Sequence, residues 1–207
     1  MPEAPRPGRH GDRRRREILA AAADVATAEG LDGLSIGRLA REVGLSKSGV
    51  AAHFGSKQDL QLHAVARAAE GYEREVMARD AEPGAARVEA LMTAWIDFIE
   101  AVPYRGGCFF AATGAEFGAR PGPVRDAVAE RTAAWIRLLE REIRTAVGLG
   151  EFRSSCDPRL LGFQLHALVQ EANLRRSLLD DAGAFDDARA LLGGVLDGVR
   201  AAPEDGR

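Results

Sequence analysis

Residues 36–54 carry the pattern that most constrains how this chain folds. The segment reads IGRLAREVGLSKSGVAAHF, with apolar residues at helical spacing on both sides of Gly44. Gly44 can supply a turn that needs positive φ. Ala40 is small enough for two helices to cross closely, and Val50 faces back toward the first helix. This spacing predicts a helix-turn-helix whose second helix has its outer face available for a DNA major groove.

The outer face of that second helix carries short or polar side chains. They allow close approach to base edges, where lysine can pair with guanine or phosphate. The only lysines, Lys47 and Lys57, both stand at predicted helix starts, which also favour phosphate. A solvated side chain is the alternative for each. The predicted DNA-contacting residues are Ser35, Ser46, Lys47, Ser48, Gly49, Ala52, His53 and Lys57, joined by Arg13, Arg14, Arg15 and Arg16, which could reach phosphates or the minor groove.

Composition extends the helical prediction to the whole chain. Alanine, the best helix former, supplies 38 of the 207 residues, and the Val, Ile and Thr runs of a parallel sheet are missing. We therefore predict an all-α protein. Its expected parts are a disordered basic tail over 1–11, a helix-turn-helix domain over 12–60, and a larger domain of longer helices over 61–207.

Formal charge is distributed unevenly between these parts. Residues 1–60 hold ten Lys and Arg against eight Asp and Glu, a balance of +2, while residues 61–207 hold eighteen against twenty-three, a balance of −5. A basic front on an acidic body favours an anionic partner at the N-terminal end, although a charged tail can also be simply solvated.

Residues 12–66 resemble the DNA-binding domain of TetR-family transcriptional regulators. The resemblance rests on Ala40, on GLS at 44–46 and on HFGSKQDL at 53–60. It identifies Phe54 as the hydrophobic residue that ends the recognition helix and Lys57 as the lysine at the start of the fourth helix. One position departs from the family pattern: Ala51 stands where the family usually has a tyrosine that contacts DNA phosphate.

The resemblance also implies a three-helix N-terminal domain, joined by a long helix to a C-terminal ligand-binding and dimerisation domain. The segment GGCFFAATGAEFGARPGPVRDAV is similar to one branch of the family. A homodimer would then read two half-sites of a palindromic operator on double-stranded DNA. Repression relieved by a small apolar or aromatic effector is the expected mode of action, with activation as an alternative.

Two further residue sets follow from this expectation. The candidate ligand pocket comprises Trp95, Phe98, Ile99, Phe109, Phe110, Phe117, Trp135, Leu139, Phe163, His166, Gln170 and Asn173, for which ordinary core packing is the alternative. The candidate dimer interface comprises Leu161, Leu165, Leu168, Ala172 and Leu179 on one helix and Leu192, Val195, Leu196 and Val199 on the next.

Other classes of protein find little support in the sequence. It contains no H-E-x-x-H, no G-x-S-x-G and no Gly-rich phosphate loop, so we expect neither an enzyme nor a cofactor. The sequence has no run of eighteen apolar residues, so we expect no membrane span. Its two cysteines suit a reducing cytoplasm. A redox-responsive regulator using Cys108 and Cys156, or a ligand-independent DNA-binding protein, remains as an alternative.

Overall fold

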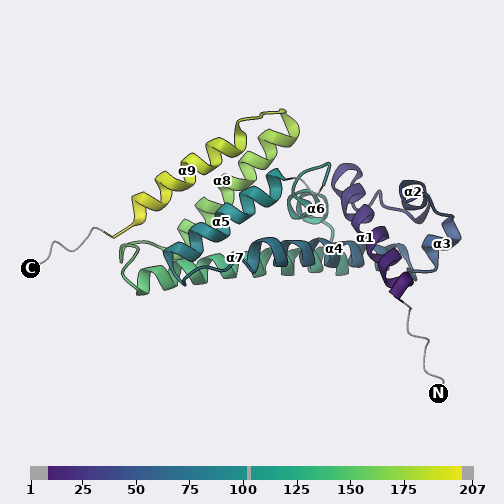
Figure 1. Cartoon of the computed structure of the whole chain (residues 1–207), viewed down its shortest axis with the longest axis horizontal. Helices are drawn as coiled ribbons and strands as arrows, with labels where there is room; N and C mark the ends of the chain where they lie inside the picture. Colours follow the sequence, from purple (N-terminus) through teal and green to yellow (C-terminus); the bar gives the residue numbers. More distant parts are fainter. Residues whose placement is uncertain (1–8, 102–103, 202–207) are drawn as a thin grey trace, which may run out of the picture. The chain divides into compact units, whose positions relative to one another are not determined.

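The computed structural model describes residues 9–101 and 104–201, and these residues form helices joined by short turns and loops (Figure 1). Their one isolated β-bridge joins Phe152 to Arg200, so the predicted all-α class is confirmed. In chain order the elements are α1 (Arg9–Glu29), α2 (Ile36–Glu42), α3 (Lys47–Ala51), α4 (Lys57–Tyr72), the π-helical turn η1 (Glu73–Met77), α5 (Ala85–Glu100), α6 (Phe109–Phe117), α7 (Pro123–Gly148), α8 (Pro158–Leu178) and α9 (Ala184–Val199).

The chain divides into two compact units. The first comprises residues up to 70 together with 104–128, and the second comprises 71–103 together with 129 onward. Helices α4 and α7 therefore each begin in the first unit and end in the second. The sequence analysis placed everything after residue 60 in one rear domain, and the grouping of 104–128 with the front unit differs from that expectation.

A shared apolar core explains this grouping. Helix α6 packs against α1, and Phe109, Phe117, Val124 and Val128 are buried in the same cluster as the apolar face of α1. Burial of aromatic side chains is a large favourable contribution to folding, so α6 is an integral layer of the front unit. The members of the cluster from α1 to α4 include Ile18, Ala22, Val25, Leu31, Leu39, Ala40, Val50, Phe54 and Leu60.

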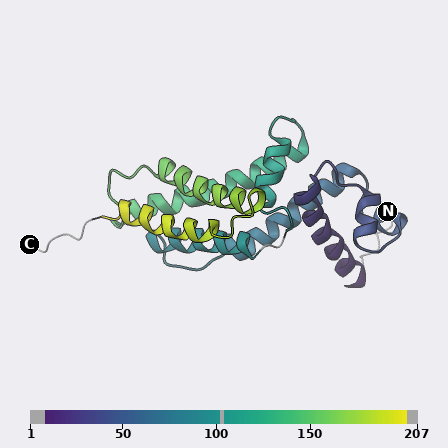
Figure 2. The same ribbon diagram turned by 90° about the horizontal axis from the view of Figure 1, so that it is seen from above.

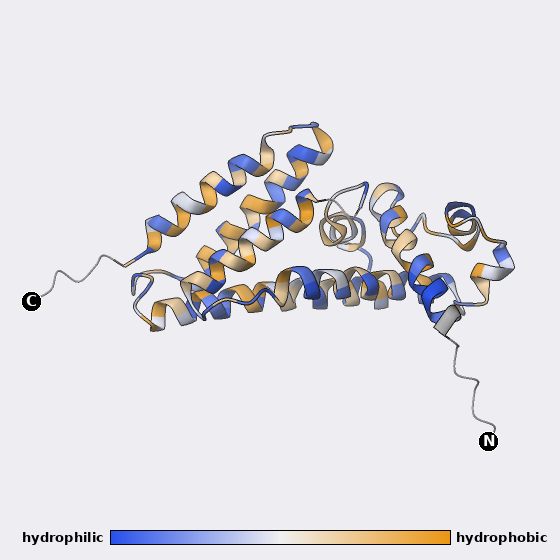
Figure 3. Ribbon diagram, viewed as in Figure 1, coloured by the Kyte–Doolittle hydropathy of each residue, from blue (hydrophilic) through white to orange (hydrophobic). Residues whose placement is uncertain are grey.

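The second unit is a bundle in which α5 packs against η1, α8 and α9, and α8 runs beside α9 (Figure 2). Apolar stretches alternate with polar ones along these helices (Figure 3), as expected for helices with one buried face. Trp95, Leu91 and Ile96 of α5 are buried, as is Leu165 of α8.

Local signals in the sequence predict most helix ends. Ser35 caps α2 by accepting a hydrogen bond from Arg38 N, and Asp157 caps α8, which has Pro158 at its first position. Helix α1 begins at Arg9, within the tail that was expected over 1–11. The long helix expected to join the two domains ends as α4 at Tyr72 and continues as η1. Residues 1–8 of the expected tail lie outside the described residues.

Candidate nucleic-acid interface

Helices α2 and α3 are held together as the spacing predicts. Gly44 has a φ of +64°, and this turn lets Leu45 N donate to Ala40 O at 2.9 Å. Ala40 and Val50 are buried where the two helices meet. The N-cap of α3 is Ser46, whose Oγ accepts from Gly49 N at 3.0 Å. These contacts fix the recognition helix from inside the domain.

The outer face of α3 is available to solvent. Ser46, Lys47, Ser48 and Ala52 are exposed, whereas Gly49 and His53 are half-buried. The aliphatic part of Lys47 passes over α2, where a Cβ on Gly37 would lie 3.3 Å from Lys47 Cε. Ser35, the residue before α2, is also exposed.

The four predicted arginine contacts lie near the start of α1, the strongly hydrophilic part of that helix in Figure 3. Arg13 and Arg14 both pair with Glu17, at 3.7 and 3.3 Å. The guanidinium carbon of Arg15 lies 5.7 Å from the centre of the Phe54 ring. Arg15 is thus fixed by a cation–π contact to the residue that follows the recognition helix.

Lys57 lies at the first position of α4, and its side chain is half exposed. A reciprocal cap precedes it: Asp59 N donates to Ser56 Oγ at 3.0 Å, and Gly55 N donates to Asp59 Oδ2 at 3.0 Å. The Lys57 Nζ donates to Asp32 Oδ1 at 2.9 Å.

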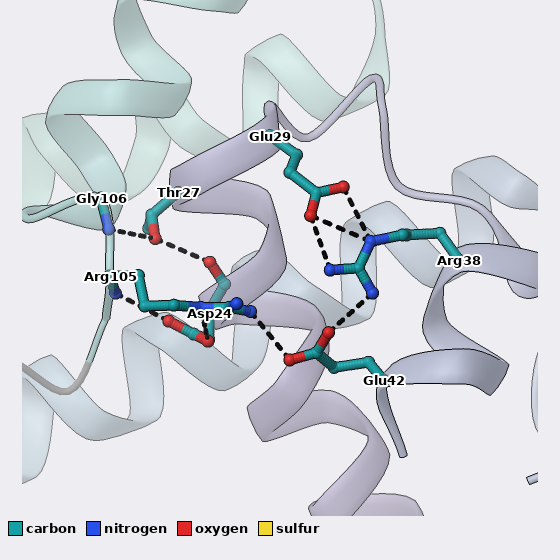
Figure 4. A network of polar contacts seen from close by, with 7 residues as sticks. All are labelled: Asp24, Thr27, Glu29, Arg38, Glu42, Arg105 and Gly106. Carbon is teal, nitrogen blue, oxygen red and sulfur yellow. Dashed lines mark hydrogen bonds and ion pairs between the residues drawn. The ribbon is translucent and has the colours of Figure 1, made fainter. Parts of the chain in front are cut away.

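A network of arginines and carboxylates ties α2 to α1 and to the segment before α6 (Figure 4). Arg38 donates to Glu29 at 2.6–2.9 Å and to Glu42 at 2.6 Å. Arg105 donates to Asp24 at 2.6 Å and to Glu42 at 2.8 Å. The Arg38 guanidinium holds the pKa of Glu29 below its usual value. The orientation of α2, and with it α3, therefore depends on residues of α1 and of the segment before α6.

Within the second unit, an aromatic cluster gathers part of the predicted ligand pocket. The Trp95 and Trp135 ring centres are 5.1 Å apart, and Tyr72 meets both rings edge-on at 6.4 and 5.4 Å. His166 lies 5.1 Å from Trp95, and Phe98 lies 5.8 Å from Tyr72. Tyr72 was not among the predicted pocket residues, all of which lie between Trp95 and Asn173 in the chain.

The aromatic cluster contains polar groups: two buried indole N–H groups and one half-buried imidazole. Among the described residues, the buried Nε1 atoms of Trp95 and Trp135 have no hydrogen-bond partner. Burial lowers the pKa of His166, so its imidazole is neutral near pH 7. Asn173 is buried, Gln170 is half-buried, and Ile99 and Leu139 belong to the core. By contrast, Phe163 is 75% exposed on α8, and Phe109, Phe110 and Phe117 lie in the first unit.

The predicted dimer residues of α8 and α9 lie on two different faces. Leu161, Leu165, Ala172, Leu192 and Leu196 are buried inside the second unit, so they form the protomer's own core. Leu168, Val195 and Val199 are half-buried, and Leu179 is exposed. The solvent-facing apolar side chains of these two helices and the turn after α8, here termed the outer apolar face, are instead Leu160, Phe163, Leu174, Leu178, Leu179 and Leu191.

Family models match both parts of the chain. Residues 18–64 match the model described as bacterial regulatory proteins of the tetR family, and residues 84–192 match the tetracyclin repressor-like C-terminal domain. The chain belongs to the TetR family of transcriptional regulators. Among the curated proteins, none matches this TetR-family chain.

Solved structures support the same fold. A TetR regulator from Chloroflexus aurantiacus has a TM-score of 0.85 and 25% identity, covering 94% of this chain and 100% of its own. A putative regulator from Saccharomonospora viridis, in complex with choline, has a TM-score of 0.74 and 23% identity, covering 92% and 100%. The structure of AibR with isovaleryl coenzyme A and operator DNA has a TM-score of 0.70 and 22% identity, covering 87% and 97%.

Family membership makes this TetR-family chain a DNA-binding regulator of transcription and not an enzyme. Across the described residues, no helix is both long and apolar enough to cross a bilayer. Burial raises the pKa of both thiols, Cys108 and Cys156, which does not favour the reactive thiolate that a redox-responsive regulator needs.

Sequence reasoning missed several residues that hold the interface of this TetR-family protein together. Arg38, Arg105, Asp32 and Glu116 entered the sequence analysis only through the count of charged residues. Their partners lie up to 88 positions away in the chain, as for Asp32 with Arg120. A helical pattern reports spacing of three or four residues, so it carries no signal for such pairs.

Proposed function

We propose that the chain is a homodimeric repressor that acts in the bacterial cytoplasm on a palindromic operator and leaves it when a small apolar or aromatic ligand binds. The observation that carries this proposal is the outer face of α3. It presents short side chains and Lys47 to solvent, while Val50 fixes the opposite face in the core. A helix fixed in this way can enter a major groove without rearrangement.

The proposed contacts divide into base readers and phosphate anchors. Lys47 and Ser48, with the backbone near Gly49, lie where base edges are read, and Ser46, Ala52 and His53 line the approach. The phosphate anchors are the arginines at 13–16, Ser35 and Lys57. Phosphate contacts add affinity that falls as salt rises, so the two sets separate in a salt titration.

A second copy of the chain is the proposed occupant of the outer apolar face. A groove of about 550 Å³ between α8 and α9 is lined by Leu168, Leu191 and Val195 together with alanines and a few charged residues. In the described protomer, a Cβ placed on Gly194 or Gly198 meets no atom within 4 Å. These helical glycines have no packing reason inside the protomer, and close approach of a second copy supplies one.

The proposed effector site is the aromatic cluster of the second unit. A buried indole N–H without an acceptor is unfavourable by about 1–3 kcal/mol, and a ligand oxygen would satisfy it. Trp95 and Trp135 thus favour a flat, apolar ligand that carries a hydrogen-bond acceptor. The choline complex of the Saccharomonospora protein adds an organic cation as the second class to test, since aromatic faces attract cations.

Two helices connect the proposed effector site to the DNA-binding unit, so ligand binding can affect DNA binding. Helices α4 and α7 both run from one unit into the other, and Tyr72 of the cluster is the last residue of α4. A ligand that favours one orientation of these helices changes the population of DNA-binding conformations by its difference in affinity for the two states.

Selection of bound sequences from a random DNA pool tests the DNA-binding proposal. We expect a palindrome whose affinity falls steeply with salt. Lys47→Met should weaken binding and relax specificity at one base position of each half-site. Lys57→Met should reduce the salt slope by about 1.8, which is about 0.9 for one phosphate contact in each of the two half-sites. Arg125→Met, which removes one exposed charge elsewhere in the first unit, is the control. An enriched site without two-fold symmetry would contradict the homodimeric reader.

Fluorescence tests the ligand proposal without DNA. The chain has two tryptophans, Trp95 and Trp135, so its tryptophan emission comes from the cluster alone. Acetophenone and ethylbenzene have similar shapes and differ by a carbonyl oxygen, and we expect acetophenone to change the emission at lower concentration. Trp135→Phe should reduce the preference for acetophenone over ethylbenzene, because phenylalanine keeps an aromatic ring and lacks the indole N–H donor. Binding of ethylbenzene or choline with equal or higher affinity would contradict the acceptor class.

A further inference from the structure

The lysine proposed as a phosphate anchor has an internal competitor. Asp32, in the loop between α1 and α2, accepts a hydrogen bond from Lys57 Nζ at 2.9 Å through one oxygen. Its other oxygen accepts from Arg120 NH1 at 3.2 Å. One carboxylate thus holds two cations, one at the start of α4 and one in the turn after α6. The Lys57 ammonium holds the pKa of Asp32 below its usual value, so the carboxylate is ionised.

Helix α6 also fixes where this carboxylate stands. Glu116 of α6 accepts hydrogen bonds from Leu31 N at 2.7 Å and from Asp32 N at 2.8 Å. The chain turns into this contact at Gly30, whose φ is +84°. Leu31 is fully buried, and its carbonyl accepts from Gln61 of α4 at 2.9 Å. The backbone of the loop is therefore tied to both α6 and α4, with the Asp32 carboxylate held between them.

A DNA phosphate and the Asp32 carboxylate compete for the Lys57 ammonium. The ammonium can lie against either anion, and an ionised carboxylate within 3 Å of it repels an approaching phosphate. Arg120 shares the carboxylate and reduces its net negative charge. We infer that Asp32 is an intramolecular counter-ion that competes with operator phosphate for Lys57, and that Arg120 controls its strength.

The consequence is a regulatory role for the α6 segment in DNA affinity. While Glu116 and Arg120 hold Asp32, its charge on Lys57 is partly neutralised. A displacement of the segment that withdraws Arg120 leaves the whole carboxylate charge on Lys57 and weakens operator binding. This inference rests on the proposed function, in that Lys57 is taken to contact phosphate.

A double-mutant cycle on the selected operator tests the competition. These side chains are about half exposed, so we expect Asp32→Asn to tighten binding by about two- to fivefold at low salt. The gain should disappear in the Lys57→Met background. Arg120→Gln should weaken binding by a similar factor and have no effect in the Asp32→Asn background. Asp126→Asn removes an exposed carboxylate from α7 in the same unit and controls for net charge.

A DNA-free measurement separates failure of this inference from failure of the proposed function. Reductive ¹³C-methylation keeps the lysine charge and yields two lysine signals, assigned with Lys47→Arg. Asp32→Asn should shift the Lys57 signal and leave Lys47 unchanged; an unmoved Lys57 signal would overturn the inference. Equal tightening by Asp32→Asn with and without Lys57 would overturn it as well, because Asp32 would then act only as a general negative charge. A wild-type chain that selects no DNA would overturn the proposed function itself.

Discussion

At the scale of single residues, Gly106 is the position with the least tolerance for a side chain. A Cβ there would lie 2.0 Å from the Thr27 carbonyl oxygen, and Gly106 N donates to Thr27 Oγ1 at 3.1 Å. We expect Gly106→Ala to reduce the free energy of unfolding by about 1–3 kcal/mol, since the α1 backbone must move.

Gly114→Ala in α6 is the matched control. Its Cβ meets no atom of the described structure within 4 Å, and alanine should stabilise that helix by about 0.5–1 kcal/mol. Urea titration measures both, and a neutral Gly106→Ala would contradict the close packing of this turn on α1.

His166 gives the second residue-scale prediction, a pH dependence. Burial lowers its pKa from 6.5, so below that pH the unfolded chain binds more protons than the folded one. The free energy of unfolding should therefore fall as pH decreases below about 6.5, the ordinary value for histidine. His166→Gln removes this group and should lose less stability than the wild type between pH 7.5 and 5.5. An identical pH profile for both proteins, measured by chemical denaturation, would contradict a neutral His166 against Trp95.

At the scale of elements, what the sequence predicts depends on how far apart the partners lie. The caps of α2, α3 and α8 can be predicted from the sequence, because Ser35, Ser46 and Asp157 bond to backbone groups two or three residues away. The packing of α6 against α1 cannot be predicted in this way. It rests on buried contacts and ion pairs across about 80 residues, such as Arg105 with Asp24. The π-helical turn after Tyr72 was also missed, because its five residues, Glu73–Met77, make about one turn and are too few to show a spacing of their own.

The same distinction applies to the functional sites. The face of α3 that carries short side chains could be proposed from the sequence, because its residues are neighbours in the chain. The aromatic cluster was predicted only in part, since Tyr72, Trp95 and Trp135 come from three elements. For the α8–α9 pair, periodicity identified an apolar stripe without saying whether it faces the protomer's core or the solvent, and Leu165 and Leu191 now mark those two faces.

Helix α3 carries the element-scale prediction. Ala51, its last residue, is exposed, so a larger side chain fits there without disturbing the core. Ala51→Tyr restores the residue that TetR-family members usually have. We expect operator affinity to rise about three- to tenfold through one added hydrogen bond to phosphate. The salt slope should stay unchanged, since tyrosine is neutral and releases no counter-ion. Fluorescence anisotropy over a range of salt concentrations checks both. Ala51→Phe, which lacks the hydroxyl, is the control, and an equal gain with phenylalanine would show packing in place of a phosphate contact.

At the scale of the whole molecule, the proposed homodimer binds a palindrome with two copies that the outer apolar face would hold together. Leu191 is 59% exposed and lines the groove between α8 and α9. Leu149, the residue after α7, is 61% exposed but belongs to neither α8 nor α9. Leu191→Glu would place a charge in the proposed interface, where it loses its hydration, and should shift the protein to monomers in sedimentation experiments. Each monomer then binds one half-site without the effective concentration that its partner supplies, so operator affinity should fall about 100-fold or more. Leu149→Glu should change neither property. A Leu191→Glu protein that remains dimeric and binds normally would exclude this face as the dimer interface, and the glycines of α9 would then need another explanation.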